Sequence, residues 1–333
     1  MPLPQAPPAP HPRLLRLRWV GLTGGATRFF PMLPQPPELA SVISRLESVR
    51  VCAHGAVQIM DCRNGSVFTR RREGRVLTHV VHHPLCPERG MCLVPPLPRF
   101  QDLKQQVFSA ILSKEEGSLS YLYLMSQYSR ETIKSIMRVY MLQDGVWRMH
   151  TLATSQFNHP RMQPKPVLVG NNIYMASSFD DDIFVLDLTT SSFSSIQLPQ
   201  GVKYYFYNTI LSRADDASSV YLIHVPIKEF QLRIWLHKGG NWLLVDTICL
   251  HEMFANLGIL DQTLDDEDIE SLSICQVGDN AEFVFLRMCG RTLYLDVTRR
   301  TLREVFGFEI HPFVMIWPPT FPSLMDDPER NSM

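Results

Sequence analysis

A strand–turn–strand unit that recurs along the chain most constrains how this sequence can fold. Residues Leu293–Thr298 (LYLDVT) match Phe184–Thr189 (FVLDLT) position by position, and a weaker copy starts near Val80. A second unit has a strand, a glycine turn and a tryptophan that opens the next strand, and it contains Trp147 and Trp242. Such self-similarity at a fixed period is the signature of a repeat architecture.

The spacing of the copies gives the size of the repeat. The first kind begins near residues 80, 184 and 293, roughly 105 residues apart, and the second kind falls between them. Two interleaved series indicate a unit of about 50 residues, the length of one four-stranded antiparallel blade. We therefore expect an all-β fold, a β-propeller of about six such blades, over residues 14–317.

Residues 166–199 illustrate one complete blade. Four short apolar segments alternate with turn residues, among them Gly170, Asn171 and Asn172, which tolerate the positive φ angles of a tight hairpin. The segments therefore predict four strands in meander order. The tryptophans at repeat positions are expected to lie in the core: Trp147, Trp235 and Trp242.

Three segments depart from the repeat. Residues 250–270 predict a short helical insertion, because apolar residues recur with helical spacing up to Gly258 and an acidic loop follows. The proline-rich residues 1–13 predict a disordered leader, with a polyproline ligand as the alternative. Residues 318–333 predict a flexible tail.

Composition excludes several classes of protein. The formal net charge is −1, so no basic field favours nucleic acid or an anionic membrane surface as a partner. No apolar run is long enough for a transmembrane helix, and the N-terminus lacks the continuous apolar region of a secretory signal. Without such a signal, the 7 cysteines are expected as reduced thiols in a cytoplasmic or nuclear protein.

Three segments resemble a known family. VQIMDCRNG (57–65), HPLCPERGMCLVPPLP (83–98) and GNNIYMASSFDDDIFVLDLTTSSFSSIQLP (170–199) are similar to the β-propeller of plant F-box proteins, particularly those of grasses. The resemblance covers roughly residues 11–317. It implies the F-box-associated domain that recognises the substrate of an SCF-type ubiquitin ligase.

The family's N-terminal F-box, a helical module, has no counterpart in residues 1–50. The resemblance therefore does not extend to direct docking on a Skp1–cullin complex, and a derivative without an F-box fits the sequence equally. A stand-alone kelch-like scaffold is the alternative function. A less favoured alternative is an enzyme on a propeller scaffold, which requires carboxylates or metal ligands that converge on the central channel.

Catalytic motifs do not support the enzyme alternative. The sequence has no phosphate-binding glycine loop and no nucleophile elbow. His251 and Glu252 resemble the start of a zincin helix, but Ala255 stands where the second histidine is needed. We expect no catalytic residue and no cofactor.

Metal sites are also not expected. Seven residues offer zinc-ligating side chains, but their spacing lacks the short knuckles of structural zinc sites. These residues are Cys52, Cys62, His79, His82, His83, Cys86 and Cys92. The acidic runs 180–182 and 265–268 lack the ligand spacing of a calcium loop, so solvated loops are the better interpretation.

The run 203–208 (KYYFYN) is the best candidate for contact with a partner. Tyrosines bury a large area while they keep a polar tip, which suits an interaction hot spot. The alternative is an ordinary strand whose rings lie in the blade core. The acidic run 265–268 offers contacts for a basic partner. The predicted binding residues are Tyr204, Tyr205, Tyr207, Asp265, Asp266 and Asp268, in a monomer that binds an unidentified target protein.

Overall fold

The structure is a computed structural model, and its described residues form an all-β fold. The described residues are 13–21, 27–31, 56–63, 65–73, 76–84, 91–98, 106–116, 118–129, 134–155, 165–176, 182–214, 216, 218–226, 229–259, 272–305 and 309–317. Most of the predicted leader, the acidic run and the predicted tail lie outside these residues.

Five sheets have four antiparallel strands each. Blade 1 contains β3 (Ala56–Arg63), β4 (Ser66–Glu73), β5 (Val76–His82) and β6 (Met91–Val94). Blade 2 contains β7 (Gln106–Glu116), β8 (Ser118–Ser129), β9 (Lys134–Gln143) and β10 (Val146–Ser155). Blade 3 contains β11 (Val167–Val169), β12 (Asn172–Ala176), β13 (Asp182–Asp187) and β14 (Ser192–Gln197). Blade 4 contains β15 (Thr209–Arg213), β16 (Val220–His224), β17 (Gln231–Lys238) and β18 (Asn241–Cys249). Blade 5 contains β19 (Ser273–Val277), β20 (Phe283–Met288), β21 (Arg291–Asp296) and β22 (Thr301–Val305).

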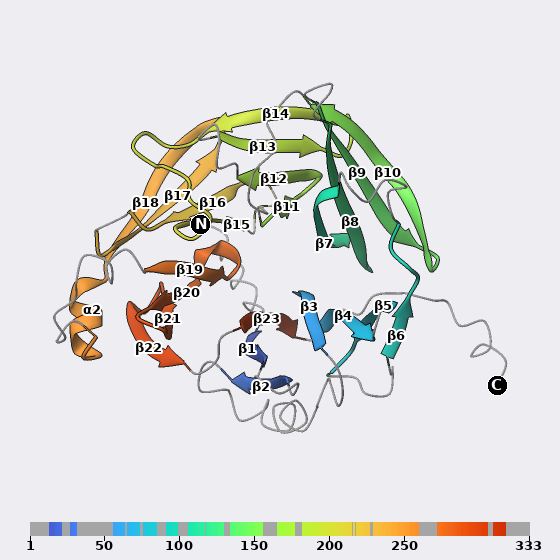
Figure 1. Cartoon of the computed structure of the whole chain (residues 1–333). Coiled ribbons are helices and arrows are strands. Elements are labelled where there is room, and N and C mark those ends of the chain that lie inside the picture. Colours follow the sequence, from blue (N-terminus) through green and yellow to red (C-terminus); the bar gives the residue numbers. More distant parts are fainter. Residues whose placement is uncertain are drawn as a thin grey trace, which may run out of the picture.

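The sheets are arranged as a ring (Figure 1). The first strand of each blade is innermost, and each inner strand contacts the inner strand of the next blade. The sixth position holds a three-stranded closing sheet, in which β1 (Arg13–Gly21) lies between β2 (Thr27–Pro31) and β23 (Glu309–Trp317). The inner strand β23 contacts both β19 and β3, so the ring of inner strands is closed.

The closing sheet corrects one expectation. About six four-stranded blades were predicted, whereas the described residues form five, together with this three-stranded sheet. The reason is that the two ends of the chain share the sheet: Arg13–Gly21 pairs antiparallel with Glu309–Trp317 along its whole length. A pairing between residues so far apart leaves no local pattern in the sequence. The predicted propeller of antiparallel blades is confirmed.

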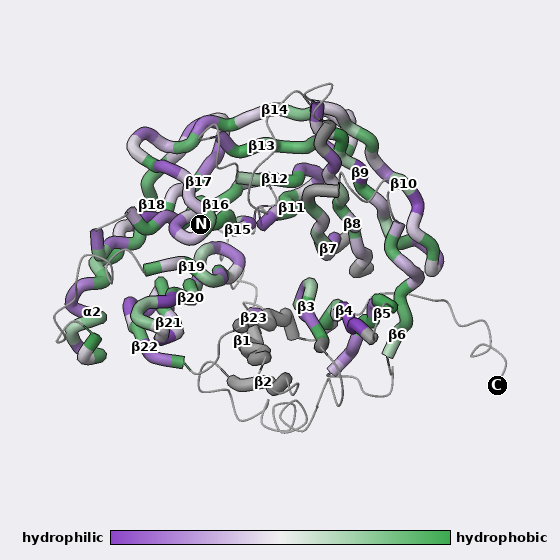
Figure 2. The backbone as a smooth tube through the Cα atoms, in the orientation of Figure 1, coloured by the Kyte–Doolittle hydropathy of each residue, from purple (hydrophilic) through white to green (hydrophobic). Residues whose placement is uncertain are grey.

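Burial explains why the strands differ in composition. The third strand of blade 3 carries the apolar run Ile183–Leu186, which is buried throughout because a blade packs against a neighbour on both faces. Its outer neighbour β14 is mostly exposed and rich in serine. Hydrophobic residues are accordingly concentrated along the middle strands of the blades (Figure 2). The core is therefore divided among the interfaces between blades.

The two kinds of sequence repeat mark alternate blades of the ring: the first kind lies in blades 1, 3 and 5, and the second kind lies in blades 2 and 4. The copies near 80, 184 and 293 lie in the third strands β5, β13 and β21, and the tryptophan copies follow the third strands of blades 2 and 4. Those tryptophan copies use two-residue turns, Asp144-Gly145 and Gly239-Gly240, in which both residues have positive φ. Positive φ at both positions defines the type I′ hairpin turn, which favours Asp-Gly and Gly-Gly pairs such as these.

The tryptophans after these turns bridge neighbouring blades. The Trp147 indole N–H of β10 donates to the Pro95 carbonyl of blade 1 (3.0 Å). The Trp242 indole N–H of β18 donates to the Gln197 carbonyl of blade 3 in the same way (2.8 Å). Both rings are half-buried, so the prediction that they lie in the core was only partly correct.

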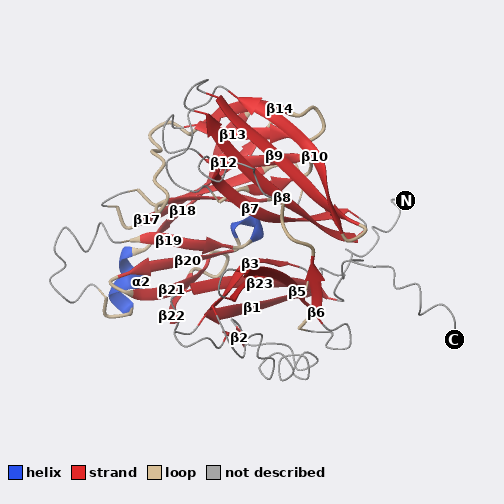
Figure 3. Cartoon of the chain, turned by 45° about the vertical axis from the view of Figure 1, so that its right-hand side comes forward, coloured by secondary structure: helices blue, strands red, loops and turns tan. Residues whose placement is uncertain are grey.

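One short helix, α2 (His251–Asn256), lies between β18 and β19, at the edge of the ring (Figure 3), and confirms the predicted helical insertion. Gly258 follows the helix with φ +64, where its amide donates to the Ala255 carbonyl (2.9 Å) and the Ile259 amide donates to the Phe254 carbonyl (3.0 Å). This is a Schellman motif, and buried Phe254 and Ile259 supply its apolar contact. Among the described helices, none is long and apolar enough to span a membrane.

The bridging tryptophans generate a prediction with a matched control. Trp147→Phe removes the hydrogen bond to Pro95, so we expect the free energy of unfolding to fall by about 1 kcal/mol more than in Trp235→Phe. The indole nitrogen of Trp235 is buried and has no hydrogen-bond partner within the described part of the chain, so its removal costs no hydrogen bond. Urea unfolding of both variants is the measurement, and equal losses would contradict the bridging role of Trp147.

Candidate functional site

The aromatic run lies in the connection between blades 3 and 4. Residues 198–208 lead from the outer strand β14 to the inner strand β15 and contain no strand. We call the end of the ring that carries such connections the crossover face. The alternative of an ordinary strand is therefore wrong, because residues 201–208 form a loop, in which Tyr204 is buried while Tyr205 and Phe206 are exposed.

Hydrogen bonds fix this aromatic loop at its C-terminal end. The buried Asn208 side chain accepts from the Tyr205 amide (3.0 Å) and from the Thr209 hydroxyl (2.8 Å). The Asn208 carbonyl accepts from the Val225 amide of blade 4 (2.9 Å), and the Tyr207 carbonyl accepts from the Ile274 amide of blade 5 (2.6 Å). The main chain of the loop is therefore tied to blades 4 and 5.

The rings of the loop divide between core and surface. Tyr204 packs in the core between blades 3 and 4, where burial raises the pKa of its hydroxyl. Tyr205 and Phe206 are 39% and 52% exposed. The rings of Tyr205 and Tyr207 are stacked with centroids 5.6 Å apart, and Phe206 meets Tyr207 edge-on at 5.3 Å. Tyr205, Phe206 and Tyr207 form what we call the aromatic platform.

The predicted binding residues therefore differ in their exposure to solvent. It brings Tyr205 and Tyr207 together at the surface, and it buries Tyr204. Phe206 is the most exposed ring of the run, and the sequence interpretation did not include it. No local signal singled out Phe206, because a continuous apolar run can also be buried completely, as Ile183–Leu186 is. Asp265, Asp266 and Asp268 lie outside the described residues and stay predictions.

A second aromatic cluster lies on the crossover face, where α2 follows blade 4. Phe230, at the start of β17, contacts the rings of His251 (5.8 Å) and Phe254 (5.7 Å) of α2 edge-on. The Phe230 carbonyl accepts from the Leu250 amide (2.7 Å), which fixes the start of the helix. His251 thus packs on an aromatic ring, and its neighbour Glu252 is exposed.

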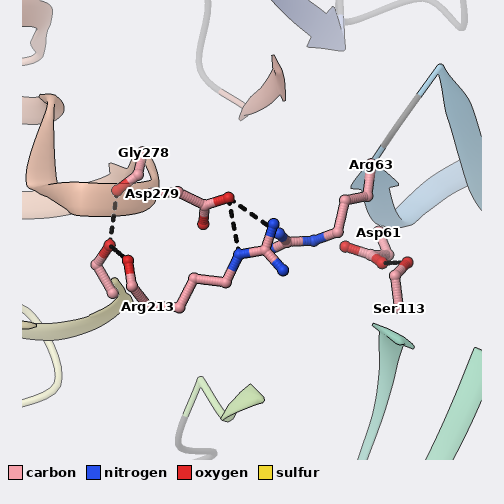
Figure 4. A network of polar contacts seen from close by, with 7 residues as sticks. Asp61, Arg63, Ser113, Arg213, Gly278 and Asp279 are labelled. Carbon is pink, nitrogen blue, oxygen red and sulfur yellow. Dashed lines mark hydrogen bonds and ion pairs between the residues drawn. The ribbon is translucent and has the colours of Figure 1, made fainter. Parts of the chain in front are cut away.

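The ring centre at the opposite face holds a polar network (Figure 4). Asp279, in the turn between β19 and β20, accepts from Arg63 at the end of β3 (3.0 Å) and from Arg213 at the end of β15 (2.9 Å). These residues belong to blades 5, 1 and 4, so the ion pairs cross the ring. Burial alone would raise the pKa of Asp279, but the two guanidinium groups outweigh it and hold that pKa below its usual value.

A second carboxylate lies beside this network. Asp61 of β3 accepts a hydrogen bond from Ser113 of β7. Burial raises the pKa of Asp61 and outweighs the attraction of Arg63. On the other side of the network, the Ser212 hydroxyl donates to the Gly278 carbonyl (2.7 Å). Both carboxylates at the ring centre are therefore engaged by protein groups.

The described histidines and cysteines of blade 1 do not gather into a metal site. His83 lies 3.2 Å from the Ser66 hydroxyl and 4.0 Å from the Cys92 sulfur, and His82 lies 3.0 Å from the Thr69 hydroxyl. Burial lowers the pKa of His82 to about 4. Within the described residues, no three histidine, cysteine, aspartate or glutamate side chains are placed to hold one ion. Cys52 and Cys86 lie outside them, and the described cysteines are free thiols.

Comparison with known proteins gives one family. Residues 58–321 match the family described as F-box protein AT5G49610-like, beta-propeller. No curated protein sequence matches the chain. Solved structures with a similar fold include TolB from Acinetobacter baumannii, at 8% identity and a TM-score of 0.45 over 91% of this chain and 66% of that one. YCF48 from Cyanidioschyzon merolae has 8% identity and a TM-score of 0.46 over 89% and 86% of the two chains. At this level of similarity, neither structure carries an argument about function.

The two carboxylates at the ring centre predict opposite effects on stability. Asp279→Asn leaves two arginines without their shared carboxylate, so we expect the free energy of unfolding at neutral pH to fall by about 1–3 kcal/mol. Asp61→Asn replaces a carboxylate whose ionisation burial opposes, so we expect no loss or a small gain.

The pH dependence separates the two effects. The stabilisation from Asp279 is present above the usual pKa of 3.8 and is lost as the pH falls through the lower pKa of the folded state. The cost of ionised Asp61 appears above 3.8 and is complete above its raised folded-state pKa. Urea unfolding of both variants at neutral pH and at about pH 3 measures this. A loss in Asp61→Asn as large as in Asp279→Asn would contradict the assignment.

Proposed function

Because the chain belongs to the F-box protein AT5G49610-like β-propeller family, whose match covers residues 58–321, we propose that it recognises the target protein of an SCF-type ubiquitin ligase. Family membership supports the coarser function, a protein-interaction module, directly. The ligase role adds that the captured protein is delivered for ubiquitination. A derivative that binds the same target without an F-box of its own is the nearest variant of this proposal.

The observation that carries the proposal is the aromatic platform. Tyr205 and Phe206 expose aromatic surface on a loop that Asn208 and two blades hold in place. A fixed aromatic group loses little conformational freedom when a partner binds, which favours affinity. Aromatic residues at such positions are typical of interaction hot spots. We propose that the target protein contacts this platform.

The ring centre supports binding over catalysis. An enzyme on a propeller scaffold needs carboxylates that are free to act on a substrate at the ring axis. Asp279 forms ion pairs with Arg63 and Arg213. Asp61 accepts a hydrogen bond from the Ser113 hydroxyl. We propose a non-catalytic monomer of the cytoplasm or nucleus, without a cofactor, whose partner is a protein and neither a nucleic acid nor a membrane.

The platform predicts a defined loss of binding. Phe206→Ala removes the most exposed ring of the platform, so we expect affinity for the target to fall by about 2 kcal/mol, or ~30-fold. Leu243→Ala is the matched control, because Leu243 is 55% exposed on the outer strand β18, away from the platform. Neither change removes a buried contact, so both variants should unfold within about 0.5 kcal/mol of wild type.

The experiment has two steps. Proximity labelling of the tagged chain in plant cells identifies proteins near the wild type, and biolayer interferometry then measures the dissociation constants of the best one. Wild-type affinity in Phe206→Ala, or an equal loss in Leu243→Ala, would show that the platform is not the binding surface.

The same labelling experiment tests the ligase role. If the chain works within a ligase, a Skp1-type adaptor and a cullin should be labelled together with the target. A target labelled without either protein would favour the stand-alone kelch-like scaffold. Adaptor docking and target binding can be separated in this experiment, because Phe206→Ala should weaken labelling of the target and leave labelling of the adaptor unchanged.

A further inference from the structure

Lys165 crosses the ring at the crossover face. It precedes the inner strand β11 of blade 3, and its ammonium group donates to the Cys275 carbonyl of β19 in blade 5 (2.5 Å). It also interacts electrostatically with His311 of β23, in the closing sheet. The Lys165 side chain from blade 3 therefore reaches blade 5, which is not its neighbour in the ring.

The Cys275 carbonyl, which Lys165 contacts, is available as an acceptor because it lies in a β-bulge. The pairing of β19 with β20 shifts between Ile274 and Gln276, so Cys275 is the extra residue of a β-bulge. The extra residue of a bulge is left out of the ladder. Its carbonyl can therefore accept from Lys165, and this contact uses one of the three N–H donors of the ammonium group.

Within the part of the chain that the structure describes, the charge of Lys165 has no carboxylate partner. The side chain is exposed to solvent. Surrounding protein atoms nevertheless lower its pKa, as expected for a group that faces the ring axis with protein on several sides. Burial and then the charge of Lys165 lower the pKa of His311 to about 4, so positive charge is disfavoured at this point.

The uncompensated charge lies next to the aromatic platform. Ile274, the residue before Cys275, donates its amide to the Tyr207 carbonyl. The Lys165 ammonium group and the main chain of the platform therefore contact consecutive residues of β19 on the crossover face. The opposite face differs, because Arg63 and Arg213 are already paired with Asp279 there.

We propose that Lys165 forms an oxyanion-binding site at the ring axis, for a carboxylate or phosphate group of the protein that contacts the aromatic platform. The identity of the ligand rests on the proposed function. If the ligand is the target protein, the recognised segment carries an anionic group close to an apolar group. An ammonium–oxyanion contact is charge-assisted and stronger than a neutral hydrogen bond. An anion there also relieves the excess of positive charge.

Small anions test the site without the partner. Sodium phosphate and sodium acetate are titrated into the purified chain by isothermal titration calorimetry, with sodium chloride at equal ionic strength as the reference. We expect Lys165→Met to weaken binding by about tenfold or more. Lys203→Met is the matched control, because Lys203 is an exposed lysine at the start of the aromatic run, and it should bind as wild type does.

Lys165→Arg keeps the charge and should retain binding, which guards against a folding defect in Lys165→Met. Phosphate binding without acetate binding would identify the ligand as a phosphorylated side chain, and binding of both would allow a carboxylate. Equal binding by wild type and Lys165→Met, equal losses in both methionine variants, or no binding beyond chloride would each overturn the site. These results do not depend on the target protein, so they are separable from failure of the Phe206→Ala experiment.

Discussion

The antiparallel pairing of β1 with β23 is the constraint on which the structure depends. It joins the two ends of the chain in one sheet and places β23 between β19 and β3 in the ring of inner strands. Each blade buries apolar surface on both faces only if it has two neighbours. Without the closing sheet, blades 1 and 5 would each present an uncovered face. The contacts that cross the ring, from Asp279 and from Lys165, require the same closure.

Local patterns in the sequence predicted the blades well. The apolar runs and glycine turns of residues 166–199 gave all four strands of blade 3, and Gly258 marked the end of α2. The three-stranded closing sheet could not be predicted in this way, because nothing near Arg13–Gly21 records that its partner is Glu309–Trp317. The third strands and the bridging tryptophans could be predicted, because their local sequence patterns repeat along the chain.

The candidate site was predicted only in part. A run of aromatic residues pointed to 203–208, but which ring is exposed depends on how Asn208 anchors the loop. Lys165 carried no signal at all, since its position follows from a bulge at Cys275, far away in the sequence. The ion pairs of Asp279 likewise join residues that lie far apart in the sequence, in blades 1, 4 and 5. The proposed binding groups lie in loops and ring-crossing contacts, whereas the repeats encode the scaffold that holds them.

The shared closing sheet also sets an order of events during synthesis. A ribosome releases β1 and β2 first and β23 last, so the first two strands wait for nearly the entire chain to be made before their partner exists. During that time, both blade 1 and the growing edge of the arc expose apolar faces, which is the condition under which nascent chains aggregate or recruit chaperones. A message that stops shortly before residue 309 would yield an open arc with all five four-stranded blades and no closed ring. The last strand therefore decides whether the ring closes.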